Sequence, residues 1–248
     1  MNKVIKYFTK QECILWCSSV CVIVVAFVLF DKTNYLTLTA SIIGVTSLIF
    51  NAKGNPFGQL LMILFSLLYG IISYTFKYYG EMITYLGMTM PMAIVAFISW
   101  LNNPYNGNKS LVKINKISLK EIFLMVVLSI IVTIIFYFIL KHFNTANLIP
   151  STISITTSFV AVYLTFRRSP YFAVAYSLND IVLIYLWINA SIIKISYLSV
   201  VVCFISFLFN DIYGFVNWKK LMKIQSKKNL SKCWDFIFFQ YPFFFSFY

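Results

Sequence analysis

Long apolar stretches separated by short polar ones dominate the chain. A helix of about 17–25 apolar residues can cross a bilayer, and stretches of this kind fall at residues 12–30, 35–51, 56–76, 82–101, 119–140, 148–166, 171–193 and 195–218. The segments between them, such as "DKTN", "NAKGNP" and "RRSP", are short and carry turn residues or charges. The pattern predicts an all-α membrane protein with eight transmembrane helices joined mostly by tight turns.

Composition agrees with this pattern and excludes a sizeable soluble domain. The chain is 60% hydrophobic and 11% charged, with a mean hydropathy of +0.83, whereas soluble domains carry about 25% charged residues. The net charge of +13 does not favour nucleic-acid binding, because the basic residues flank apolar stretches and build no basic domain. The bilayer itself is therefore the expected partner of most of the surface.

The basic residues predict the orientation in the membrane. With the N-terminus in the cytoplasm, only Lys32, Lys77, Lys141 and Lys194 of the 20 Lys and Arg residues face outside. Cytoplasmic loops carry an excess of Lys and Arg. We therefore expect a multi-pass plasma-membrane protein with both termini in the cytoplasm.

The apolar stretches contain an internal repeat. Pro56 and Pro170 each begin a stretch, and Trp100 and Trp218 each close the following one, at offsets of 114 and 118 residues. This predicts two parallel three-helix bundles joined by one helix and related by an axis along the membrane normal, with an extra helix at the N-terminus. The predicted divisions are 1–34 (N-terminus and extra helix), 35–101 (first bundle), 102–147 (basic loop and linking helix), 148–218 (second bundle) and 219–248 (basic, then aromatic, cytoplasmic tail). Residues 232–248 are either an interfacial segment or the end of an altered reading frame, and we assign them no function.

The stretch "YSLNDIVLIYLW" places a carboxylate deep in the predicted membrane. Asp180 lies nine residues from the start of its helix, or roughly 13 Å at 1.5 Å per residue, which is near the midplane of a core about 30 Å thick. A carboxylate there costs about 2.5–3.5 kcal/mol on insertion scales. Tyr176, Asp180 and Trp187 share one helix face, and Asn179 adjoins it. A role in binding or transport would explain the cost.

Further polar and aromatic residues suggest the rest of a binding site. Asn210, Asp211 and Tyr213 lie on the last predicted helix, and Gln59, Ser66, Tyr69 and Ser73 form a polar stripe on 56–76. Such residues also hold membrane helices together without binding a ligand. Aromatic faces and a carboxylate favour a flat, cationic heteroaromatic solute. Cys13, Cys17 and Cys21 share one face of the first predicted helix and are interpreted as small apolar residues, because no His or second Cys cluster stands at ligand spacing. We therefore expect neither a metal nor a cofactor.

Two segments resemble the PnuC family of nicotinamide riboside transporters. They are "NPFGQLLMILFSLLYGIISYTFKYYGEMITYLGMTMPMAIVAFISW" and "FLFNDIYGFVNWKK", and the resemblance covers residues 33–222. It implies a fold similar to SWEET sugar transporters and facilitated diffusion of a vitamin-type nucleoside, which a cytoplasmic kinase then traps by phosphorylation. Relatives in the family carry riboflavin, thiamine or deoxynucleosides.

The chain departs from the family at three positions that the resemblance places near the ligand. Family members often carry a Trp followed four residues later by an Asn, where this chain has Tyr176 and Asp180. A family Gln is replaced by Ala93. Tyr176 can still stack on a ring, and Asp180 can pair with a pyridinium or a thiamine cation.

We therefore predict a transporter, not an enzyme, for nicotinamide riboside or a related heterocycle. Tyr176, Asn179, Asp180 and Trp187 are expected to form one wall of the binding site, Asn210, Asp211 and Tyr213 the adjoining wall, and Gln59 and Tyr69 the facing one. The alternatives are thiamine, riboflavin or deoxynucleoside transport, or a proton-coupled carrier. An intramembrane aspartyl protease would need Asp180 paired with Asp211, but its "GxGD" motif is absent. The sequence leaves homo-oligomerisation open.

Overall fold

The computed structural model describes residues 7–75, 79–145 and 147–240, with side chains as far as residue 227. Within these residues, eight helices are long and apolar enough to cross a membrane, as predicted. They are α2 (Lys10–Ala26) with the π-helix η1 (Phe27–Asp31), α3 (Tyr35–Ala52), α4 (Phe57–Thr75), α5 (Tyr79–Thr84) continuing through the π-helix η2 (Tyr85–Thr89) into α6 (Met90–Leu101), α7 (Leu119–His142), α8 (Leu148–Phe166), α9 (Phe172–Ile193), and α10 (Leu198–Gln240), which follows the short 3-10 helix η3 (Ile195–Tyr197).

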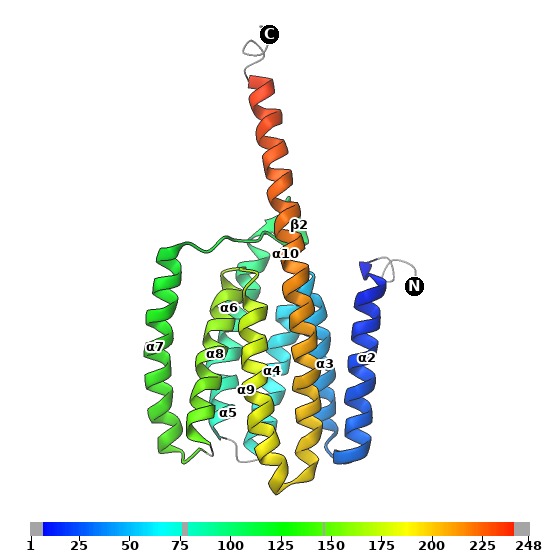
Figure 1. The fold of residues 1–248 in the computed structure, drawn as a ribbon, viewed down its shortest axis with the longest axis vertical. Helices are drawn as coiled ribbons and strands as arrows, with labels where there is room; N and C mark the ends of the chain where they lie inside the picture. Colours follow the sequence, from blue (N-terminus) through cyan, green and yellow to red (C-terminus); the bar gives the residue numbers. More distant parts are fainter. Residues whose placement is uncertain (1–6, 76–78, 146, 241–248) are drawn as a thin grey trace.

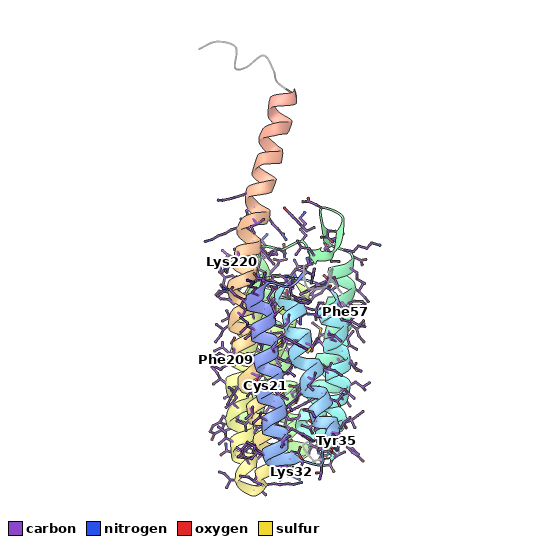
Figure 2. All side chains as sticks on the ribbon, turned by 90° about the vertical axis from the view of Figure 1, so that its right-hand side faces the viewer. Cys21, Lys32, Tyr35, Phe57, Phe209 and Lys220 are labelled. Carbon is purple, nitrogen blue, oxygen red and sulfur yellow. The ribbon has the colours of Figure 1, made fainter. Side chains whose placement is uncertain are left out.

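The helices run along one common direction, so the molecule has two ends (Figure 1). Both described termini and a small hairpin, β1 (Pro104–Tyr105) and β2 (Asn108–Val112), lie at one end, here named the terminal end. Lys32 and Tyr35 mark the opposite end, whereas Lys220 lies toward the terminal end (Figure 2). The last turns of α10 project beyond the bundle at the terminal end (Figure 1).

Two three-helix bundles form the centre of the molecule. α3 and α4 pack together and α6 packs on α4, while α8 and α10 both pack on α9. Between the bundles, α3 contacts α10 and α6 contacts α8. The first helix of each bundle thus meets the last helix of the other, as a two-fold axis parallel to the helices requires. We name the surface between the bundles the seam.

Matched hydrogen bonds repeat this relation at the terminal end. Trp100 Nε1 donates to the Thr165 carbonyl oxygen at 2.9 Å, and Trp218 Nε1 donates to the Asn51 carbonyl oxygen at 2.7 Å. Each tryptophan closes its own bundle and bonds the first helix of the other. The two indole rings meet with centroids 5.3 Å apart and are fully buried. We name this contact the tryptophan layer.

The adjacent residues are matched as well. The Ser99 hydroxyl donates to the Phe166 carbonyl oxygen, and the Asn217 amide donates to the Ala52 carbonyl oxygen, at 3.0 and 2.8 Å. These groups pair the last carbonyls of α8 and α3, which no helical N–H can reach. The seam is therefore fixed at the terminal end by polar contacts from both bundles.

The two remaining helices, α2 and α7, are also equivalent to each other. They lie on opposite flanks of the molecule (Figure 1). Each begins with a capping box, Thr9 with Glu12 and Ser118 with Glu121. Each of these glutamates also forms a salt bridge to the turn after the neighbouring first helix, Glu12 to Lys53 and Glu121 to Arg167. The duplication therefore covers four helices in each half of the chain, one more than the repeat visible in the sequence.

The third helix of the first bundle is interrupted, unlike its counterpart α10. In η2 each backbone hydrogen bond spans one residue more than in an α-helix, and Pro91 follows at the start of α6. Proline has no N–H to continue the ladder, and π-helical turns are common at functional sites. Tyr85, the first residue of η2, contacts Phe65 and Tyr69 of α4.

Candidate functional site

An aromatic cluster fills the seam, with Tyr69 of α4 at its centre. The Tyr69 ring lies 4.5 Å from Tyr85, 5.8 Å from Phe204 and 6.2 Å from Trp187, measured between centroids. Phe65 completes the cluster at 5.5 Å from Tyr69. Tyr69 is 4% exposed and Trp187 is 3% exposed. The cluster joins aromatic residues of both bundles, and rings of this kind stack on flat ligands.

Two carboxyl groups lie together in the same seam. Asp180 of α9 and Asp211 of α10 are each 4% exposed, and their carboxyl groups lie against each other. A carboxylate only accepts hydrogen bonds, so a hydrogen bond between two carboxyl groups requires a proton on one of them. Apart from this mutual contact, Asp180 Oδ2 receives no hydrogen bond from the described residues. The structure thus brings these two predicted residues together.

Tyr176 lies between the carboxyl pair and the tryptophan layer. It packs on Phe172, which itself contacts both tryptophans, and its hydroxyl bonds Thr165. Trp187, in contrast, belongs to the aromatic cluster on the other side of Asp180. Tyr176, Asp180 and Trp187 therefore share one face of α9, as predicted. Along that face they lie at three successive depths: beside the tryptophan layer, at the carboxyl pair and in the aromatic cluster.

Asn179 faces away from this wall. Its Oδ1 accepts hydrogen bonds from the hydroxyls of Ser154, Thr157 and Ser158, at 3.2, 2.9 and 3.0 Å. All three donors belong to α8. These hydrogen bonds hold α8 against α9 within the second bundle. Asn179 therefore contributes to helix packing and does not line the seam with Tyr176, Asp180 and Trp187.

Three other predicted residues bond neighbouring helices. The Gln59 amide donates to Asn51 Oδ1 at 2.8 Å and joins α4 to α3. Asn210 donates to Ser19 Oγ at 2.9 Å, and the Tyr213 hydroxyl donates to Glu12 Oε1 at 3.1 Å, so both face α2. Helix geometry explains why Asn210 and Tyr213 do not face the seam, because residues one or two positions from Asp211 point to other sides of α10.

Several buried polar atoms in the bundles lack a hydrogen-bond partner within the described residues. They include Ser66 Oγ, Ser73 Oγ and Asn210 Oδ1. Ser66 and Ser73 are one turn below and one turn above Tyr69 on α4. Buried polar groups are nearly always paired, so unpaired ones beside an aromatic cluster indicate atoms available to a ligand or to water. The seam therefore offers rings, hydroxyls and a carboxyl pair.

Three cluster residues were missed by the sequence reasoning: Phe65, Tyr85 and Phe204. Tyr85 lies in "YLGMT", which carries no helical polar stripe because η2 changes the periodicity there. Phe204 is one of 26 phenylalanines in the chain, and nothing in the pattern singles it out. The Pro91 that follows η2 was the one signal of a local helix break.

A small cavity of about 20 Å³ lies at the opposite end of the seam. It is lined by Glu81 of α5, by Thr145 and Asn147 of the turn before α8, by Ser151 of α8, and by Leu186, Trp187 and Ala190 of α9. Trp187 separates this cavity from the aromatic cluster. The described side chains contain no group of three or more His, Cys, Asp or Glu residues placed to hold a metal ion.

Known proteins are similar to this chain in sequence and in fold. The family model described as "Nicotinamide mononucleotide transporter" matches residues 34–220. The chain is 27% identical over 201 residues to the nicotinamide riboside transporter PnuC of Neisseria mucosa, covering 79% of this chain and 76% of that protein. It is 22% identical over 193 residues to the PnuC protein of Haemophilus influenzae, covering 77% and 81%.

A solved structure confirms the architecture. The crystal structure of the vitamin B3 transporter PnuC superposes with a TM-score of 0.76 at 26% identity and covers 88% of this chain and 94% of that one. The family model extends from the start of α3 to the turns of α10 just after Trp218, and so includes the whole seam. The chain therefore belongs to the PnuC family of membrane transporters.

Proposed function

We propose that this protein carries nicotinamide riboside across the plasma membrane by facilitated diffusion. The observation that carries the proposal is the buried seam, where an aromatic cluster lies beside the Asp180 and Asp211 carboxyls. Nicotinamide riboside has a flat pyridinium ring, and a cation beside a carboxylate and aromatic faces is stabilised by both. Two relatives named as nicotinamide riboside transporters support the same substrate.

The charge of the seam favours the nucleoside over its phosphate. The matching family model is described by the mononucleotide, which carries an additional phosphate. Recognition of phosphate normally uses Arg or Lys side chains or backbone N–H groups. The carboxyl groups of Asp180 and Asp211 lie near the aromatic cluster instead, and like charges repel at close range. We therefore assign the nucleoside as the substrate.

Transport would follow from rocking of the two bundles about the seam. The terminal end, which sequence predicts to be cytoplasmic, is closed by the tryptophan layer. Opening this layer while closing the other end would release the solute inside. In this scheme a cytoplasmic kinase would phosphorylate the nucleoside, and the phosphorylated product would be retained because the seam disfavours phosphate.

Calorimetric binding to the purified protein tests the substrate. The ligands are nicotinamide riboside, its mononucleotide, thiamine, riboflavin and thymidine, each measured with the wild type and with Asp180→Asn. We expect nicotinamide riboside to bind and the variant to lose roughly tenfold in affinity, about 1.4 kcal/mol. Glu121→Gln, which removes a carboxylate near the terminal end, is the matched control and should bind as the wild type does. Binding of thymidine or riboflavin alone would contradict the proposal.

The carboxyl pair also supports a proton-coupled carrier as a second candidate. The carboxyl groups of Asp180 and Asp211 lie against each other within the bundle, and intramembrane carboxyls form proton relays in many transporters. Uptake into proteoliposomes with and without an imposed pH gradient separates the two mechanisms. Uptake that follows the gradient, and loses this dependence in Asp211→Asn, would replace facilitated diffusion with coupling.

A further inference from the structure

The cavity at the opposite end of the seam has the composition of a binding site. Its lining comes from both halves of the chain, with Glu81 from the first bundle and Ser151, Trp187 and Ala190 from the second. A volume of about 20 Å³ is enough for one or two water molecules, so the cavity is narrow in this conformation. Trp187 forms its inner wall and also belongs to the aromatic cluster.

Glu81 points an unpaired oxygen into this region. Its side chain is partly buried, and its Oε2 is fully covered yet receives no hydrogen bond from the described residues. Thr145 Oγ1 is buried and unpaired in the same way. A buried carboxylate oxygen without a donor is costly. Its presence at the mouth of a pathway is explained if a ligand supplies the missing partner.

Gly80 explains how Glu81 reaches this position. A Cβ at Gly80 would lie 2.6 Å from Leu140 Cδ2 and 2.9 Å from Thr145 Cγ2, closer than real side chains approach. Only glycine therefore lets α5 pack so tightly against the end of α7 and the turn that follows. The close approach brings Glu81 into the same cavity lining as Thr145 and Asn147.

We propose that this cavity is an outer recognition site, where the cationic ring of an incoming solute is held by Glu81 before it passes Trp187. The inference rests on the proposed function, because it concerns the same solute at an earlier position. Glu81 attracts a pyridinium and repels a phosphate, so it selects the charge of the solute before the aromatic cluster selects its shape. Thr145 and Asn147 supply hydrogen-bonding groups for the carboxamide or the ribose.

A neutral analogue of the solute separates the effect of its charge from the effect of its shape. Dihydronicotinamide riboside has the same ribose and carboxamide but no positive charge on its ring. The measurement is the initial rate of uptake into proteoliposomes, as a function of concentration, for both forms. For Glu81→Gln we expect KM for the cationic form to rise roughly 3- to 10-fold, as for one partly screened charge pair, with KM for the neutral form unchanged.

Two further variants make the result specific. Asp31→Asn removes a carboxylate from η1 at the same end, outside the cavity lining, and should leave both KM values unchanged. Glu81→Asp keeps the charge and should restore most of the affinity for the cation. Added salt should change the difference between wild type and Glu81→Gln only slightly, because a partly buried charge pair is screened much less than an exposed one.

The outcomes separate this inference from the proposed function. If Glu81→Gln changes KM equally for the two forms, or no more than Asp31→Asn does, the outer site is wrong while the substrate stands. If the wild type transports neither form, the proposed function itself fails. A charge-selective effect of Glu81→Gln that Glu81→Asp reverses would establish the outer site.

Discussion

The two halves of the chain share one framework but differ where they meet. Residues 114 apart in the first two helices of each bundle, and 118 apart in the third, occupy equivalent positions, as the tryptophan layer shows. At these offsets, Asp180 corresponds to Ser66 and Asp211 corresponds to Ala93. The first half thus presents a hydroxyl and a methyl group where the second half presents two carboxyls.

The matched residues at the terminal end hold the fold together, whereas the unmatched residues of the seam are the ones available to recognise a solute. The matched hydrogen bonds at the terminal end are backbone contacts that either half can make with different side chains, such as Ser99 and Asn217. The seam needs different chemistry on its two sides, because a solute without two-fold symmetry presents a different face to each. Duplication therefore fixed the frame, and divergence of the seam positions made the site asymmetric.

The largest expected effect tests the equivalence of the tryptophan layer. Trp100→Ala and Trp218→Ala should each reduce the free energy of unfolding by about 3–5 kcal/mol, because each removes a fully buried ring and leaves a carbonyl unpaired. Thermal unfolding in detergent measures both. Trp16, which is 36% exposed, is the matched control, and Trp16→Ala should cost far less. A large loss in only one of the buried pair would break the equivalence.

The salt bridges of the flanking helices should behave unequally although they are equivalent in position. Glu12 is 2% exposed and also accepts a hydrogen bond from Tyr213 of the other half, so Glu12→Gln should cost about 2–3 kcal/mol. Glu121 is more exposed, at 26%, and Glu121→Gln should cost less than about 1 kcal/mol. Equal losses in thermal unfolding would show that burial does not distinguish the two bridges.

Glycines on α3 and α10 give the smallest pair of effects. A Cβ at Gly44 would collide with Phe207 across the seam, so Gly44→Ala should destabilise the protein by about 1–3 kcal/mol. At Gly214 the nearest atom to a new Cβ is Ala52 Cβ at 3.7 Å, an ordinary contact, and its counterpart in the first half is Ala96. Gly214→Ala should therefore be neutral or slightly stabilising. The same unfolding measurement decides, and a marked loss in Gly214→Ala would contradict the assigned correspondence.

Much of the fold could be predicted from the sequence. The eight spans follow from the length of the apolar stretches, because only a helix of that length satisfies its backbone hydrogen bonds within a bilayer. The paired prolines and tryptophans revealed the two bundles. The equivalence of α2 and α7 was not visible, because it rests on two short capping boxes, "TKQE" and "SLKE", 109 residues apart in otherwise dissimilar helices.

The candidate site was less predictable, since sequence spacing places a side chain on a helix face but does not say what that face meets. Asp180 was singled out by its charge and its predicted depth in the membrane, and both can be read from the sequence. That Asp211 lies against it, that Asn179 is occupied by three hydroxyls of α8, and that Asn210 and Tyr213 face α2 were decided by helix packing. The sequence thus determined that a carboxylate must be accommodated within the membrane. Only the tertiary structure decided its partner. Which residues of two helices meet depends on how each helix is rotated and shifted relative to the other, and the sequence of one helix does not contain this information.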